Sequence, residues 1–412
     1  MTGMQRREFL GLGALAAAGA LVGTRVAFAG ASARQPRFVL IILRGALDGL
    51  AAVPPYADPD YAGLRREVAL RAPGEPGGAL PLNGFFGLHP ALGFLQQCYT
   101  ARELIVLHAV ASPYRERSHF DGQDVLENGS VAAHALPSGW LNRALMQLPG
   151  ALPRETGVAL GQNVPLVMRG PAAVTSWSPT RLSALDEETL ARLTDLYAAD
   201  PLLSVRLADA LAADALVAAE DTAPGQMQAA AQPPRGVQAY NARYAQVVQA
   251  AAGFLRQENG PRVAVFDTSG WDTHANEGGA QGQLAGRLGA LDQALATLKQ
   301  GLGAAWSDTA VLLVTEFGRT AAVNGTRGTD HGTGAAAFLL GGAVAGGRVI
   351  ADWPGLTTHA LYQGRDLAPT LDLRSVCKGI LAEHLAVPER ALEDGVFPDS
   401  RAAKPLRGLL RA

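Results

Sequence analysis

The chain has 412 residues, of which 48% are apolar and 17% charged, so it can bury the core of one large domain. Its 35 Lys and Arg residues nearly balance its 37 Asp and Glu residues, and no basic run of the kind that binds nucleic acid occurs. Composition therefore excludes global disorder and argues against a nucleic-acid partner.

The first segment predicts export. An Arg6-Arg7 pair precedes an apolar, Ala- and Gly-rich stretch that continues to about Gly23, and the small-residue sites AFA and ASA follow. This order is typical of a twin-arginine signal peptide. The alternative is a membrane anchor, but the stretch is shorter than the ~20 strongly apolar residues that a span prefers. We expect a signal peptide over residues 1–33, a periplasmic or secreted location, and no stable membrane span after cleavage.

Five apolar runs of strand length predict a largely parallel sheet in an α/β domain over residues 34–412. They are continuously apolar, as strands buried on both faces are. Helix-length amphipathic segments between them, such as residues 89–102 and 283–302, predict helices that flank the sheet. The five runs are residues 37–45, 104–110, 261–270, 309–315 and 335–342.

Three further segments depart from this alternation. Residues from about 183 to 256 have only helical periodicity, interrupted by a Pro- and Gly-rich linker, and predict a helical insert. Residues 341–356 combine Gly pairs with short apolar runs, which predicts a hairpin. A last helix is expected over residues 373–385.

Polar side chains follow four of the strands. In an open parallel sheet the carboxyl ends of the strands form the ligand-binding edge, so these side chains are expected to converge there. Carboxylates and imidazoles without thiolates are ligands for zinc, manganese or another borderline divalent cation. The two cysteines, Cys98 and Cys377, lie too far apart for a thiolate zinc site, and a single disulfide stays open. The polar candidates are Asp48, Ser118, His119, Asp267, Asp272, His274, Glu316, Arg319, Asp330 and His331.

Each candidate also has a purely structural interpretation, as a helix cap, turn residue or surface group. Arg319 could bind an anionic oxyacid or pair with Glu316. Ser118 precedes a short helix, where a hydroxyl could be a nucleophile or an ordinary N-cap. Convergence of all four strand exits favours a polar site over independent caps.

The sequence resembles the domain of unknown function 1501 family, a group of twin-arginine-exported, sulfatase-like proteins distantly related to the alkaline phosphatase superfamily. The matching motifs occur in family order over nearly the whole mature chain. They are LRGALDGLAAVPPYADPDYAGLR, RSHFDGQDVLENG, GWDTHANE, LLVTEFGRT, GTDHGTG, GGAVAGGRVIADWPGL and LYQGRDLAPTLDLRSV. The resemblance implies an alkaline-phosphatase-like fold with a mostly parallel central sheet flanked by helices.

The same resemblance implies a divalent-metal site at the carboxyl edge of the sheet. Asp48 and Ser118 match the first metal ligand and the nucleophile by position. Asp272 or Asp267, together with His274 and His331, looks suitable for a second metal. Where many relatives have Asp-His after the fourth strand, this chain has Glu316 followed by Phe317. Phe317 cannot bind a metal, so the first site is short of one imidazole unless Asp330 or His331 supplies the ligand.

The resulting hypothesis is a metal-dependent hydrolase of phosphate or sulfate esters. Ser118 would attack the anionic ester, and Arg319 would stabilise the transferred group's oxygens. The alternative is a non-catalytic secreted protein that keeps the hydrolase fold and uses the cleft to bind another exported protein.

Overall fold

The computed structural model describes residues 35–149, 156–179 and 237–411, with short helical pieces between residues 192 and 208. The predicted signal peptide and most of the predicted helical insert lie outside the described residues. The described residues form a nine-stranded sheet with the order β10-β4-β9-β8-β1-β7-β5-β6, and β11 also pairs with β4. A small two-stranded sheet, β2-β3, accompanies it.

The bounds of the strands confirm all five runs predicted from the sequence and add six short strands. The strands are β1 Arg37–Arg44, β2 Leu80–Pro81, β3 Gly87–Leu88, β4 Leu104–Ala111, β5 Gly157–Leu160, β6 Val174–Trp177, β7 Val263–Ser269, β8 Thr309–Val314, β9 Ala335–Leu340, β10 Arg348–Ile350 and β11 Leu371–Asp372. β9 is antiparallel to both β4 and β8, whereas the other pairs in the large sheet are parallel. The mostly parallel α/β prediction is therefore confirmed.

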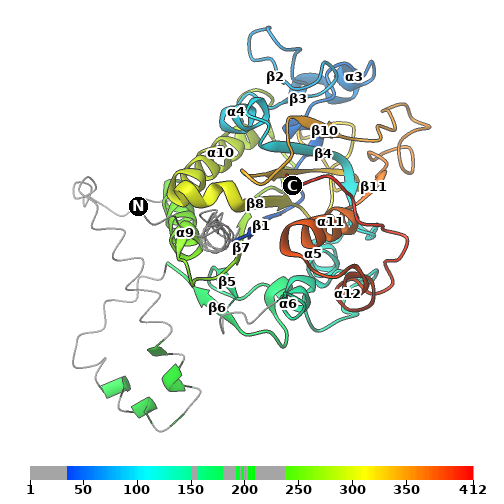
Figure 1. Cartoon of the computed structure of the whole chain (residues 1–412). Helices are drawn as coiled ribbons and strands as arrows, with labels where there is room; N and C mark the ends of the chain where they lie inside the picture. The colour runs from blue at the N-terminus through cyan, green and yellow to red at the C-terminus, as the bar shows by residue number, and fades with distance from the viewer. Residues whose placement is uncertain are drawn as a thin grey trace, which may run out of the picture. The chain divides into compact units, whose positions relative to one another are not determined.

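Helices cover both faces of this sheet (Figure 1). The α-helices are α2 Gly49–Ala52, α3 Tyr61–Arg65, α4 Gly93–Thr100, α5 His119–Asn128, α6 Trp140–Leu145, α9 Val237–Arg256, α10 Gln283–Leu302, α11 Leu373–Leu385 and α12 Glu389–Ala391. Alternate residues of β1 point to opposite faces, as a strand requires. Val39 and Ile41 belong to the core beneath α4, α9 and α10, whereas Leu40 and Ile42 belong to the core beneath α6 and α11.

Two predicted segments differ from their expected form. α9 lies within the predicted insert but packs against α10, β5 and β7, so it is part of the helical layer of the α/β body. The hairpin predicted for residues 341–356 is wrong, because β10 pairs in parallel with β4 and not with β9. The Gly pairs instead carry the chain across the start of β4, where the Gly346 and Gly347 amides donate to the carbonyls of Arg102 and Leu104.

The structure also bears on two predicted helices and on the two cysteines. The helices predicted at 283–302 and 373–385 are α10 and α11 with the same bounds. Cys98 and Cys377 are both buried free thiols in different cores, so they form no disulfide with each other. No described helix is long and apolar enough to cross a membrane.

The buried His108 in β4 gives the fold a defined pH response. Its Nε2 donates to the carbonyl of Val53 (3.0 Å) and its Nδ1 accepts from the Ala109 amide (2.8 Å), so only the neutral ring fits. Burial lowers the pKa of His108 from 6.5 to about 4. The unfolded chain therefore takes up this proton first as the pH falls, and stability is lost between these two values.

We predict that His108→Gln reduces the loss of unfolding free energy between pH 6.5 and pH 4 by up to ~3 kcal/mol, because the variant has no imidazole to protonate. Urea unfolding at several pH values measures this difference. His134→Gln is the control, since the His134 side chain is 74% exposed. Equal pH slopes for wild type and His108→Gln would contradict the prediction.

Candidate metal centre

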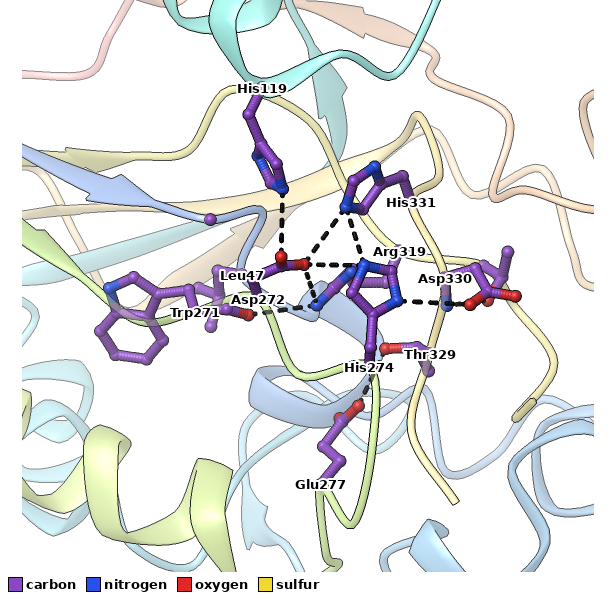
Figure 2. Close-up of polar contacts among 12 residues, drawn as sticks. Leu47, His119, Trp271, Asp272, His274, Glu277, Arg319, Thr329, Asp330 and His331 are labelled. Carbon is purple, nitrogen blue, oxygen red and sulfur yellow. Dashed lines mark hydrogen bonds and ion pairs between the residues drawn. The ribbon is translucent and has the colours of Figure 1, made fainter. Parts of the chain in front are cut away.

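Three imidazoles converge on one carboxylate at the carboxyl edge of the sheet (Figure 2). Asp272 and His274 come from the loop after β7, His331 from the loop after β8, and His119 from the first position of α5. Asp272 Oδ1 lies 3.1 Å from His274 Nε2 and 3.2 Å from His331 Nε2, and Asp272 Oδ2 lies 3.5 Å from His119 Nε2. The His274 and His331 Nε2 atoms are 3.0 Å apart. His119, Asp272 and His331 each offer one ligand atom within 4.8 Å of the others.

Gly45, directly after β1, allows the strand exits to meet. Its amide donates to Glu316 Oε1 (2.8 Å). Its φ of +116° is strained for residues with a side chain, and a Cβ there would lie 2.8 Å from the Asp272 amide nitrogen. A glycine at this position therefore lets the exits of β1, β7 and β8 pack backbone to backbone.

The residues after β8 fold back on themselves and present Arg319 beside His331. These two residues form an antiparallel bridge, with the Thr320 amide donating to the carbonyl of Asp330 (2.9 Å). Gly332 lies against the Arg319 carbonyl, and a Cβ at this glycine would come within 2.4 Å of it. Gly328 lies equally close to the carbonyl of His274. With glycine at these two positions the backbone segments can approach closely, so Asp330 and His331 lie next to the loop after β7.

Each of the three imidazoles directs its Nδ1 away from the centre and toward a carboxylate or carbonyl oxygen, which can only accept a hydrogen bond. The three pairs are His119 Nδ1 with Glu316 Oε1 at 2.8 Å, His274 Nδ1 with Asp330 Oδ1 at 3.3 Å, and His331 Nδ1 with the Arg117 carbonyl at 2.9 Å. The neutral rings therefore carry their protons on Nδ1. Such outward hydrogen bonds to carboxylates and carbonyls are typical of histidines that bind metals through Nε2.

The inward-facing atoms consequently present electron pairs to one another. When the three rings are neutral, their Nε2 atoms have no proton to donate. Arg319 donates to Asp272 Oδ1 (2.9 Å), and the Nε2 lone pairs are left open to a further cation. His119 Nε2 is buried and has no hydrogen-bond partner within the described part of the chain. For a tetrahedral zinc site with ligand bonds of 2.0–2.1 Å, neighbouring ligand atoms lie about 3.3 Å apart. The four separations of 3.0 to 3.5 Å are close to this value, whereas one ligand atom from each of His119, Asp272 and His331 lies within a wider 4.8 Å of the others.

The pKa shifts report the same electrostatics. The hydrogen bond to Glu316 raises the pKa of His119 against the opposing effect of burial. Burial would raise the pKa of Glu316, but its hydrogen bonds, first among them that from His119, lower it overall. Burial also opposes ionisation of Asp272, whose pKa is nevertheless lowered by Arg319 and the surrounding imidazoles. Burial and the charge of His119 lower the pKa of His331. The lowered pKa values of Asp272 and Glu316 keep both carboxylates ionised, which favours a positive charge beside them.

Phe317 supports the centre through its ring. The imidazole of His119 stacks on it, with ring centroids 5.0 Å apart, and the centroid of His331 lies 5.3 Å away. The missing imidazole expected at position 317 is thus offered by His119 from α5, which the sequence indicated only as one of several polar candidates. The signal for His119 was its place at the start of a helix beside Ser118, in combination with the absence of a histidine at 317.

Arg319 contacts the carboxylate at the centre. Its Nη2 lies 2.9 Å from Asp272 Oδ1 and donates to the Trp271 carbonyl at 3.5 Å. Glu316 instead accepts hydrogen bonds from Gly45, His119, Gln123 and Thr315. The Arg319 side chain is 0% exposed, so in this structure it orients Asp272 from behind.

Four of the predicted metal ligands lie outside the inward-facing set. Asp48 caps α2 by accepting from the Ala51 amide (3.0 Å) and pairs with Arg65. Asp267 pairs with Arg44. Glu316 and Asp330 lie behind His119 and His274, respectively, as outer partners. Sequence reasoning placed all of these at the right edge of the sheet but could not resolve which oxygen faces inward.

The carboxylate of Asp48 also belongs to a buried ionic group that the sequence did not indicate. Arg65 Nη2 contacts Asp48 and lies 3.5 Å from Glu277 Oε1. Burial and the nearby charge of Asp48 raise the pKa of Glu277 to about 8, which favours the protonated carboxyl. Arg65 thereby supplies Asp48 with a cation from the protein itself.

Ser118 has the extended backbone of an N-cap residue, with φ −88° and ψ 126°, immediately before α5. Its side chain makes no capping hydrogen bond with the described residues of that helix. The hydroxyl is thus not used for capping. It adjoins His119 in the chain.

A protein family and two solved structures are similar to this chain. The model described as "Protein of unknown function (DUF1501)" matches residues 105–396. No curated protein matches.

Two solved structures are similar at low identity. The crystal structure of Ps i-CgsB in complex with k-i-k-neocarrahexaose is 10% identical, with coverage of 90% of this chain and 77% of that chain at a TM-score of 0.38. The C-terminal periplasmic domain of EcEptC from Escherichia coli, in complex with Zn, is 9% identical, with coverage of 74% and 72% at a TM-score of 0.35. At these TM-scores the likeness implies nothing about chemistry.

The matched residues begin in β4 and end shortly after α12. They contain the whole set of inward-facing residues. The match spans well over half of the chain and includes the motifs named from the sequence, except the first, at residues 43–65. The chain therefore belongs to the DUF1501 family.

Proposed function

We propose that the protein is an exported, metal-dependent hydrolase of phosphate or sulfate esters with one divalent cation, zinc or manganese, at the centre. The observation that carries the proposal is the set of inward-facing Nε2 atoms around Asp272, each on a ring whose Nδ1 is fixed by an acceptor. His119, Asp272 and His331 would hold the cation, with His274 beside them. Export rests on the twin-arginine pattern of residues 1–33.

The exposure of the centre is consistent with a catalytic role. The side chains of Asp272 and His274 are 39% and 43% exposed, so one side of the centre faces solvent. Catalytic metal sites keep such an open position, whereas structural sites are closed. A bound cation would supply Lewis acidity to the oxygens of the ester.

The chain's own residues would divide the remaining work. Ser118 is the candidate nucleophile, because its hydroxyl is not used for capping and lies at the start of α5, where backbone amides favour an anion. His274, backed by Asp330, is placed to take up a proton at the exposed side of the centre. Arg319 keeps Asp272 oriented.

The second candidate is a non-catalytic binding protein that retains the same centre. The burial of Arg319 favours it, because a guanidinium that is 0% exposed and paired with Asp272 does not reach an incoming ester in this structure. Such a protein would bind a metal and an anionic or protein partner without turnover.

The proposed ligands define the first test. Replacement of His119, Asp272 or His331 by alanine should weaken zinc or manganese binding by at least about a hundredfold, which exceeds the smaller losses seen for outer partners. Metal analysis and titration of the purified mature protein measure this. His134→Ala is the matched control, since this exposed histidine pairs with Asp121 and Asp124, away from the centre. A wild-type protein without a stoichiometric divalent metal after growth with zinc and manganese would refute the metal centre.

The role of Ser118 separates the two candidate functions. If this hydroxyl attacks the ester, Ser118→Ala should lower kcat on aryl phosphate or aryl sulfate esters by about 10³-fold or more, with unchanged metal content. Ser118→Ala should also leave the unfolding midpoint nearly unchanged, because no capping bond is lost. Metal-loaded wild type that turns over neither ester class would favour the binding protein, and an active Ser118→Ala variant would exclude Ser118 as nucleophile.

A further inference from the structure

The buried group around Arg65 joins the same strand exits that build the centre. Arg65 ends α3 and its side chain is 0% exposed. Its guanidinium contacts Asp48 at the exit of β1, Glu277 in the loop after β7 (3.5 Å), and the carbonyl of Thr320 in the loop after β8 (3.4 Å). One side chain from outside the centre therefore touches all three exits.

Glu277 extends this contact to the residues that flank the inward-facing set. Its Oε2 accepts from the hydroxyl of Thr329 (2.8 Å), and its amide donates to the carbonyl of Arg327 (3.0 Å). The Thr329 amide in turn donates to the carbonyl of Thr273 (3.1 Å). Thr273 lies between Asp272 and His274, and Thr329 directly precedes Asp330 and His331. Glu277 is thus one of several residues that join the two ligand-bearing loops, and its side chain bonds to Thr329 (Figure 2).

Burial of these charged side chains costs free energy, which indicates that they do more than fill space. Asp48, Arg65 and Glu277 are all fully or almost fully buried. Removing charges from water carries a penalty that their mutual attraction only partly offsets, and apolar residues of the same volume often give equal or greater stability. Ionic groups do, however, impose direction and distance on the segments that carry them, which apolar contacts do not.

We propose that Asp48, Arg65 and Glu277 form a positioning hub that holds the loop 270–282 and the loop 315–334 in mutual register. The hub makes no contact with substrate. It fixes the separation of Asp272 and His274 on one loop from His331 on the other, in the metal-free protein as well as the metal-bound one. The hub's role in metal binding rests on the proposed function. Its effect on the register of the two loops does not.

Hydrogen exchange of the metal-free protein tests the hub directly. Glu277→Ala should speed amide exchange by about tenfold or more in peptides from both loops together, while peptides from β1 stay protected. Thr329→Val, which removes only the hydroxyl bond to Glu277, should produce the same paired effect to a smaller extent. Glu277→Gln should restore protection, since the amide has the shape and hydrogen-bonding capacity of the protonated carboxyl.

The matched control is Lys378→Met. Lys378 is a buried cation in α11 that donates to the carbonyl of Ser400 (2.8 Å), and neither residue belongs to the two loops. Its loss should destabilise the fold without selective exchange in the two loops. Exchange that rises in only one loop, that rises equally across β1, or that matches the pattern of Lys378→Met would overturn the proposal.

Metal affinity provides the second readout. In Glu277→Ala the affinity for zinc should fall about 10–100-fold, as for other residues that orient metal ligands, and Glu277→Gln should recover most of it. Unchanged zinc affinity in Glu277→Ala would overturn the positioning role. If the wild type binds no metal, the proposed function fails, and the exchange experiment alone then decides whether the hub exists.

Discussion

The arrangement of the centre depends on one electrostatic constraint, the meeting of several electron-pair donors with no proton between them. His119, His274 and His331 all donate hydrogen bonds from Nδ1 to outer acceptors, so their Nε2 atoms face Asp272 as bases. Lone pairs at 3.0 to 3.5 Å repel one another unless a cation lies between them; Arg319 offsets this repulsion at Asp272 Oδ1, and a bound cation would offset it at the Nε2 atoms. The glycines, the bridge between Arg319 and His331 and the outer carboxylates hold that arrangement against its own repulsion.

The fold was largely accessible from the sequence because buried strands and amphipathic helices leave strong local patterns. The five long apolar runs and the helices α10 and α11 occur where those patterns predict them. β5 and β6, of four residues each, were missed because so short a run carries little periodicity. The wrong hairpin at 341–356 has the opposite cause: its glycines suit a tight turn locally, and only the long-range pairing of β10 with β4 excludes one.

The site was accessible only in part, for a different physical reason. That the polar side chains gather at one edge follows from the topology of a parallel sheet. Which of them face inward depends on side-chain pairing across distant segments, such as Asp48 with Arg65 and Glu316 with His119. Asp48 and Glu316 are therefore indistinguishable from ligands in the sequence, and His119 is indistinguishable from a surface residue until its ring is seen on Phe317.

The apolar ring of Phe317 has a consequence beyond orientation. Two of the imidazoles lie against a hydrocarbon surface that is itself 2% exposed, so water cannot solvate the centre from that side. In such a low-dielectric wall the field of Asp272 and Glu316 is screened less than it would be in solvent. A residue that cannot coordinate a cation thus increases the attraction of its neighbours for one.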